Sequence, residues 1–162
     1  MLDTLCYLHE DTDVWFEITT LLIPGENDGD DELREMTRWV VEHLGRDVPM
    51  HFTAFHPDWK MLDKPPTPPA TLQRARRIAI DNGVRYVYTG NVHDSEGGSS
   101  FCAGCGSVLI ERDWYRLGGW GLNEQGACSN CGVTLPGVFE ATPGNWGRRR
   151  QAVRLRDWAP PA

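Results

Sequence analysis

The chain has 162 residues, of which 40% are hydrophobic and 24% are charged, and its formal net charge is -7. This length and composition predict a globular protein of one domain, or one domain with a small appendage. The acidic balance argues against a general nucleic-acid role, and the lack of a membrane-length apolar run or signal peptide leads us to expect a cytoplasmic protein without a membrane or nucleic-acid partner.

The first segments of the chain predict a helix and then a strand. Residues 2–9 place Leu2 and Leu5 on one helical face, as the tail of a helix would. Cys6 has no partner nearby, and we interpret it as a small buried hydrophobic residue and not as a reactive thiol. Residues 14–23 are β-branched, aromatic and almost continuously apolar, which predicts a strand buried on both faces of a parallel sheet.

A helix and a second strand follow. The acidic segment 27–32 (NDGDDE) offers helix N-caps, and apolar residues then recur at helical spacing until Gly45 offers a C-cap. The apolar residues in question are Leu33, Met36, Val40 and Leu44. Residues 50–55 (MHFTAF) predict the second strand.

The proline-rich stretch PPTPP leads into another helix. Thr67 and Pro68 suit the N-cap and the first helical position, so the prolines need no linker or SH3-ligand interpretation. The predicted buried residues of this helix are Leu72, Ala75, Ile78 and Ala79. Asn82-Gly83 ends the helix, and residues 84–88 (VRYVY) predict a third strand.

Strands and helices that alternate at this spacing predict an α/β fold of right-handed βαβ units with parallel strands. Three strands cannot close a barrel. In parallel α/β folds, functional groups lie on the loops after the carboxyl ends of the strands. Those loops carry His56, Asp58, Trp59, Lys60, Asn91, His93 and Asp94. Each could be an ordinary polar loop residue, but their convergence on one rim indicates a site, with His56 as the best single candidate.

Four of the five cysteines fall in two copies of one motif, CAGCG and CSNCG, after a Gly- and Ser-rich segment (95–100) that predicts a flexible hinge. Each Cys-x-x-Cys turn points two thiolates at one ion, and the glycine after it adopts the angles that a tight knuckle needs. The spacing is typical of a structural four-cysteine zinc site. The predicted ligands are Cys102, Cys105, Cys128 and Cys131, in a small ribbon with a strand around residues 108–110.

Other interpretations of these cysteines stay open. Two disulfides are one alternative, although nothing in the sequence indicates an oxidising compartment. Iron in a rubredoxin-like site is another, because tetrahedral sulfur ligands suit either metal. A closed four-thiolate site has no open coordination position, so we expect it to stabilise the ribbon and not to catalyse.

The end of the chain is basic, with Arg148, Arg149, Arg150, Arg154 and Arg156. No aromatic residues are interleaved with these arginines, as a base-stacking platform would need. This favours a solvated tail, or a segment that covers an acidic surface of a partner, over a nucleic-acid-binding segment.

The stretches WFEITTLLIPGENDGDDEL, MHFTAFHPDWKMLDKPPTP and YVYTGNVHD, with the knuckles after GGSSFC, together resemble a known family. The chain resembles the C-terminal part of the radical SAM enzyme of the AmmeMemoRadiSam system, a relative of the pyruvate formate-lyase activating enzymes. The resemblance covers residues 2 to about 147. It implies a partial βα barrel in which a 4Fe-4S cluster, held by a Cys-x3-Cys-x2-Cys loop, cleaves S-adenosylmethionine to a 5′-deoxyadenosyl radical.

The resemblance also implies roles for particular residues. The three strands would be the fifth and sixth of the barrel and one that follows. His56 matches a position that lies against the adenine of S-adenosylmethionine in activating enzymes, and Pro24-Gly25 matches the turn after the fifth strand. Activating enzymes often carry an arginine on the fifth strand near the cofactor, whereas this chain has Thr19 at the corresponding position.

The resemblance divides the chain into the last βα units of a barrel (1–94), a zinc ribbon (95–140) and a basic tail (141–162). No Cys-x3-Cys-x2-Cys motif is present, so we expect a fragment that is inactive alone, that needs the missing N-terminal half as its partner, and whose Met1 is not the natural start. No catalytic residue is assigned, and kinship with the activators implies a protein or peptide substrate. The alternative is a non-catalytic α/β and zinc-ribbon module that binds a partner protein.

Overall fold

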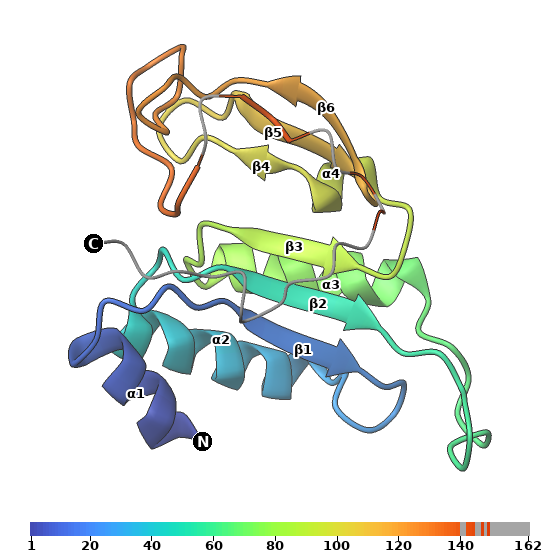
Figure 1. Cartoon of the computed structure of the whole chain (residues 1–162). Helices are drawn as coiled ribbons and strands as arrows, with labels where there is room; N and C mark the ends of the chain where they lie inside the picture. The colour runs from blue at the N-terminus through green and yellow to red at the C-terminus, as the bar shows by residue number, and fades with distance from the viewer. Residues whose placement is uncertain (140–141, 145–146, 148, 150–162) are drawn as a thin grey trace, which may run out of the picture.

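The computed structural model describes residues 1–139, 142–144, 147 and 149. Helices and strands alternate in its N-terminal part, and an antiparallel sheet follows (Figure 1). In chain order the elements are α1 (Leu2–Glu10), β1 (Ile18–Leu22), α2 (Asp30–Leu44), β2 (Met50–Ala54), α3 (Pro69–Asp81), β3 (Val87–Gly90), α4 (Ser95–Gly98), β4 (Ser100–Phe101), β5 (Val108–Asp113) and β6 (Arg116–Trp120).

The first sheet is parallel, with strand order β1-β2-β3. Met50 is the partner of Ile18 on one side and of Val87 on the other. Helices α2 and α3 lie on the same face of this sheet (Figure 1) and share one apolar core with it. The four residues predicted to be buried in α3 are the four that the structure buries there. The predicted α/β fold with parallel strands is confirmed.

The opposite face of the parallel sheet is largely polar. The register aligns Thr19, His51 and Tyr88 side by side across the three strands. In β2, residues with this orientation alternate with the buried residues that face the helices, as the period of a strand requires. Parallel sheets are normally covered on both faces, so a polar face that no helix of the described residues covers is an unusual feature of this sheet.

The prediction for the first strand was wrong in length and in burial. Strand β1 covers only Ile18–Leu22, and Val14 and Trp15 precede it with exposed side chains. Leu21 is also exposed on the strand itself. The reason is that β1 is an edge strand of this sheet and that, among the described residues, helices cover one of its faces and not the other.

The third strand is shifted along the chain from its predicted position of 84–88 and runs from Val87 to Gly90. Val84 and Tyr86 are almost fully buried, although they lie before the strand. The backbone N–H of Met50 donates to the carbonyl of Tyr86 (2.9 Å). The apolar pattern therefore predicts the burial of Val84 and Tyr86 correctly, but it does not predict where strand β3 begins and ends.

The sequence predicts Thr67 as the N-cap of α3, and this prediction is wrong. The N-cap is Pro68, and Pro69 begins the helix. The buried hydroxyl of Thr67 donates to the carbonyl of Leu22 (2.5 Å) and accepts from the backbone N–H of Phe55 (3.0 Å). Thr67 thus joins the ends of β1 and β2, because its side chain turns into the sheet and away from the helix.

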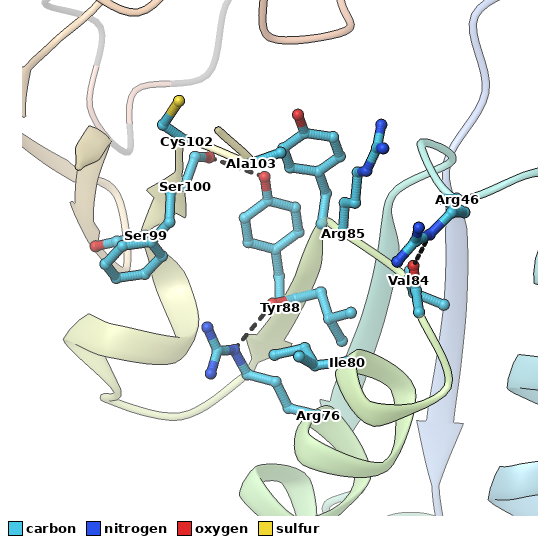
Figure 2. Close-up of a pocket in the computed structure, with 14 residues that line it drawn as sticks. Arg46, Arg76, Ile80, Val84, Arg85, Tyr88, Ser99, Ser100, Cys102 and Ala103 are labelled. Carbon is cyan, nitrogen blue, oxygen red and sulfur yellow. Dashed lines mark hydrogen bonds between the residues drawn. The ribbon is translucent and has the colours of Figure 1, made fainter. Parts of the chain in front are cut away.

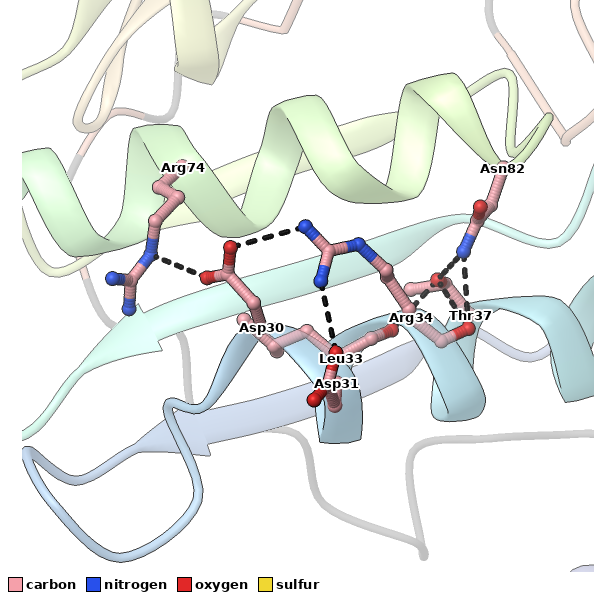
Figure 3. Close-up of polar contacts among 7 residues, drawn as sticks. All are labelled: Asp30, Asp31, Leu33, Arg34, Thr37, Arg74 and Asn82. Carbon is pink, nitrogen blue, oxygen red and sulfur yellow. Dashed lines mark hydrogen bonds and ion pairs between the residues drawn. The ribbon is translucent and has the colours of Figure 1, made fainter.

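Polar contacts also join α2 to α3 (Figure 3). The Asn82 amide donates to the hydroxyl of Thr37 (2.8 Å) and to the carbonyl of Arg34 (3.0 Å). At the other end of the helix pair, Arg74 forms an ion pair with Asp30 (3.2 Å). These contacts fix the two helices at both ends of their apolar interface.

The segment 95–100 is folded and is not an open hinge. The carboxylate of Asp94 accepts a hydrogen bond from the backbone N–H of Gly97 (3.0 Å), which caps the short helix α4. Ser99 and Ser100 are buried, and the Ser99 hydroxyl accepts from the backbone N–H of Arg112 (3.0 Å). Glycine and serine here allow close packing and do not create a flexible linker.

The antiparallel sheet β4-β5-β6 lies in the ribbon, the segment for which the sequence analysis predicts the bounds 95–140. The ribbon packs against the β3 edge of the parallel sheet (Figure 1), because its core includes Tyr86 together with Leu109, Ile110 and Leu122. The Tyr88 hydroxyl also lies 2.8 Å from that of Ser100. The ribbon and the α/β part therefore share an interface and are not separated by a linker.

Most of the predicted basic tail, 141–162, lies outside the described residues, including four of its arginines: Arg148, Arg150, Arg154 and Arg156. Among the residues that are described, no helix has the length and apolar character needed to cross a membrane.

Candidate metal centre

The two cysteine motifs fold into two copies of the same knuckle. In the first, the backbone N–H of Cys102 donates to Ser107 (2.8 Å), and the N–H of Gly106 donates to Cys102 (2.9 Å). In the second, Cys128 has the same pair of bonds, with Val133 and with Gly132, at 2.8 Å each. The two glycines have φ angles of +73° and +78°, a conformation that glycine adopts without strain.

The knuckles bring the four cysteine sulfurs together. The Sγ atoms of Cys102, Cys105, Cys128 and Cys131 all lie within 4.8 Å of one another. Cys102 Sγ is 3.4 Å from Cys131 Sγ, and Cys105 Sγ is 3.7 Å from Cys128 Sγ. Four thiolates about 2.3 Å from one ion in a tetrahedron would be about 3.8 Å apart. The four sulfurs are therefore placed to hold one metal ion.

Hydrogen bonds around the cluster favour thiolates at one pair of ligands. The contacts of Cys105 with the side chains of Ser107 and Asn130 lower the pKa of Cys105 to about 5. Burial raises the pKa of Cys102, but hydrogen bonds from the backbone N–H groups of Cys105 and Gly104 outweigh that effect, and the pKa is lowered. Thiolates are the form that binds metal.

Cys131 shows the opposite behaviour. The backbone N–H of Val133 favours its thiolate, but the neighbouring sulfurs of Cys102 and Cys105 outweigh that bond and raise the pKa of Cys131 to about 12. Sulfurs this close repel one another when all are charged. A cation among them would remove that repulsion and keep all four as thiolates.

The remaining cysteine is not part of the cluster. Cys6 lies on α1 and is partly buried against the core of the α/β part. This position agrees with its interpretation as a small hydrophobic residue.

The predicted rim residues are only partly brought together. His56 lies two residues after the end of β2 and is exposed, and no hydrogen bond or ion pair of its side chain is found among the described residues. Lys60 lies over the ring of Trp59, 4.6 Å from its centroid, at an exposed turn that also includes Asp58. These four residues form no compact constellation with the loop after β3.

The loop after β3 has a more definite structure. Asn91 donates to the carbonyl of Ala54 (3.2 Å) and so joins the carboxyl ends of β3 and β2. Asp94 caps α4. The His93 Nδ1 atom lies 3.0 Å from Asp113 Oδ1, and its ring stacks on Trp114. His93 therefore contacts the β5–β6 hairpin and does not point toward His56.

Sequence reasoning missed a row of interacting side chains on the polar face of the sheet. His51 Nε2 lies 2.5 Å from Glu17 Oε2, and the His51 ring stacks on Tyr88 at 5.0 Å. Arg112 of β5 lines two cavities together with these rings. The alternation in MHFTAF could have placed His51 on the polar face, whereas the position of Arg112 depends on how the ribbon packs.

A cavity of about 460 Å³ lies between α3, β3 and the start of the ribbon (Figure 2). Three arginines line it: Arg46, Arg76 and Arg85. Each already uses at least one of its nitrogens: Arg46 contacts the carbonyl of Gly83 (2.9 Å), Arg76 that of Val87 (3.0 Å) and Arg85 the carboxylate of Asp47 (3.0 Å). These arginines fix the loops around the strand, so we assign this cavity a structural role.

Comparison with known proteins gives one informative similarity. The chain is 43% identical over 131 residues to an uncharacterized protein of Methanocaldococcus jannaschii. The match covers 80% of this chain but only 39% of that relative, so the chain spans well under half the length of the protein that it matches. No protein-family model matches the chain.

Proposed function

We propose that the chain is the C-terminal part of a radical SAM enzyme similar to that of the AmmeMemoRadiSam system, with an accessory structural zinc site. The observation that carries this proposal is the parallel sheet with helices on one face only and polar side chains on the other. A barrel has this construction, because its helices form the outer layer and its functional groups lie inside or at the rim. Thr19, His51 and Tyr88, which are partners across the three strands, would then line the inside of the barrel.

Positions implied by the family resemblance support the proposal. Thr19, the counterpart of the arginine near the cofactor, has the orientation of the helix-free face. His56 follows the carboxyl end of β2, where a residue against the adenine of S-adenosylmethionine would be needed. Gly25, in the turn after β1, has a φ angle of +76°. The relative is long enough to hold the missing half of a barrel as well.

The cysteines of this chain do not fit a radical SAM cluster. Four of them face one another in the knuckles, and Cys6 lies on α1 in another part of the molecule. The cluster would have to be held by the missing N-terminal half, which is the partner that we propose. The isolated chain should therefore be inactive, and we assign no reaction step to its residues.

We assign zinc as the metal of the knuckles, because a closed four-thiolate site made in a cell usually holds zinc. Elemental analysis of the purified chain should find about one zinc per chain. A broad visible absorbance that disappears in Cys128→Ser would instead identify iron.

The DNA sequence upstream of the Met1 codon is a direct test of the proposal. We expect an open reading frame that continues upstream of the Met1 codon and encodes Cys-x3-Cys-x2-Cys. A stop codon and a ribosome-binding site directly before Met1 would argue strongly against a truncated enzyme.

A second candidate is a non-catalytic module that binds a partner protein. It is favoured by the exposed side chains of Trp59 (79%) and Leu62 (69%) after β2, because a partner could cover them. The extended protein, which we define as the product of the reading frame that continues upstream of Met1, separates the two candidates when it is titrated with S-adenosylmethionine. Perturbation of the His56 loop supports the enzyme, whereas no binding, together with tight capture of a defined partner, supports the module.

A further inference from the structure

A cavity of about 170 Å³ lies at the carboxyl end of β3, between the polar face of the sheet and the ribbon. Its lining includes His51 from β2, Tyr88 and Asn91 from β3 and its loop, and Arg112 with Trp114 from the β5–β6 hairpin. A second cavity of the same volume is also lined by His51, Tyr88 and Arg112. Arg112 therefore lies between two hollows on this face.

Arg112 has no carboxylate partner among the described residues. Other arginines of this part of the chain, such as Arg34, Arg74 and Arg85, form ion pairs. Arg112 is partly buried, and no hydrogen bond of its guanidinium is found among the described residues, whereas its backbone N–H donates to the Ser99 hydroxyl. A partly buried guanidinium without an anion is unfavourable, and its donor geometry matches carboxylate and phosphate.

The acidic groups around the cavity are already satisfied. Glu17 is engaged by His51 and by the indole N–H of Trp15 (3.2 Å). The carboxylate of Asp94 accepts from Thr89 (3.1 Å) and from the backbone of Gly97. Asp94 keeps its negative charge, because both of its donors are neutral, but its oxygens are occupied. The group left to receive an anion is the guanidinium of Arg112, which lines the cavity with His51. The Nδ1 atom of His51 has no partner in the described part of the chain.

The backbone around the cavity is strained. Asn91 and Trp114 both line it, and both have positive φ angles, +61° and +56°. The first residue of such a hairpin turn is normally Gly, Asn or Asp, so a tryptophan there carries backbone strain. Stacking of Trp114 on His93 (5.2 Å between ring centroids) holds the ring over the rim. Strain of this kind tends to occur at ligand sites.

We propose that this cavity binds a small anionic ligand, with its carboxylate or phosphate group at Arg112 and its body against Tyr88 and Trp114. The site lies where ligands bind in parallel α/β folds, beyond the carboxyl ends of the strands. The inference uses only this chain's own residues and is independent of the radical SAM assignment.

The test is a titration of the ¹⁵N-labelled chain with two probes, inorganic phosphate and acetate, followed by NMR. At least one probe should give saturable shifts of the Arg112 Nε–H and of the Gly90 and Asn91 amides. Arg112→Gln should weaken that binding by about tenfold or more, because a charge-assisted hydrogen bond is lost. The probe that binds more tightly tells phosphate from carboxylate.

Arg116→Gln is the matched control, since it removes an exposed arginine from the same hairpin and should leave binding unchanged. Arg112→Lys keeps the charge and should bind better than Arg112→Gln, which guards against a folding defect. The proposal is overturned if neither probe gives saturable shifts at these residues, or if Arg112→Gln binds as tightly as the unmodified chain.

Discussion

Single residues in this protein join elements in ways that their type alone does not predict. Thr67 is the clearest case, because one buried hydroxyl connects the ends of β1 and β2. The sequence placed it next to a helix, and a threonine before proline resembles an N-cap there. Its actual partners are distant in sequence, so only the packed structure reveals them.

Thr67→Val should therefore destabilise the protein by about 1–3 kcal/mol, because the N–H of Phe55 and the carbonyl of Leu22 lose a buried partner. The free energy of unfolding in urea measures the effect. Thr67→Ser keeps the hydroxyl and should lose much less. Equal stability of Thr67→Val and the unmodified chain would mean that the two bonds contribute nothing.

Trp114 raises the question of why a bulky residue occupies a strained turn. In Trp114→Gly, relief of about 1–2 kcal/mol of backbone strain opposes the loss of aromatic stacking and the entropy of glycine, each about 1 kcal/mol. We expect the free energy of unfolding to change by less than about 1 kcal/mol, whereas Phe52→Ala, in the core, should cost about 3–5 kcal/mol. A large loss of stability in Trp114→Gly would assign Trp114 a structural role.

At the scale of elements, the regular parts could be predicted and the connections could not. All four buried residues of α3 and three of the four in α2 were predicted, because an apolar stripe of period 3.6 determines which face packs. In α2 the structure buries Thr37 fully, whereas the predicted Met36 is only partly buried. Strand β3 was misplaced because Val84 and Tyr86 are buried without belonging to the ladder. The segment 95–100 was misread because its composition suits either a flexible linker or tight packing, and the cap from Asp94 decides between them.

The cysteine motif predicted that the glycine of each knuckle has special backbone angles, and both glycines have positive φ angles. These angles determine which substitutions the knuckle should tolerate. A Cβ atom at Gly132 would have no atom of the described residues within 4 Å apart from its immediate chain neighbours. Gly132→Ala should therefore lose only the cost of its positive φ angle, about 1 kcal/mol. Asparagine tolerates this conformation better, so Gly132→Asn should lose less. Thermal unfolding of the metal-loaded protein ranks the two variants, and the reverse order would contradict this account.

The metal should contribute most of the stability of the ribbon. Cys102→Ser removes one of four ligands, and metal binding to such knuckles contributes on the order of 10 kcal/mol to folding in zinc-finger peptides. We expect NMR signals of the ribbon to collapse while those of the α/β part persist, although signals of Tyr86 and Tyr88 at the interface should shift.

Cys6→Ser is the control, because Cys6 lies outside the cluster. It should leave the metal content and the ribbon signals unchanged. If the ribbon of Cys102→Ser stayed folded, its apolar core would be sufficient without metal.

At the scale of the whole molecule, the four metal ligands could be assigned from sequence because their spacing is a local property of two short motifs. The rim site could not be assigned in the same way. His56, Asn91 and His93 were expected to converge, but Asn91 joins two strands and His93 contacts the ribbon hairpin. The grouping of His51 with Arg112 arises only because the ribbon packs against β3, and no motif in the sequence encodes that packing.

We propose that this chain belongs to a radical SAM enzyme, and formation of 5′-deoxyadenosine tests that proposal most directly. The extended protein, reconstituted with iron and sulfide under anaerobic conditions and supplied with a reductant, should convert S-adenosylmethionine to 5′-deoxyadenosine. The 162-residue chain alone should not. His56→Ala in the extended protein should bind S-adenosylmethionine more weakly, while His43→Ala, on α2, should not. A cluster-loaded extended protein that forms no 5′-deoxyadenosine would contradict the account.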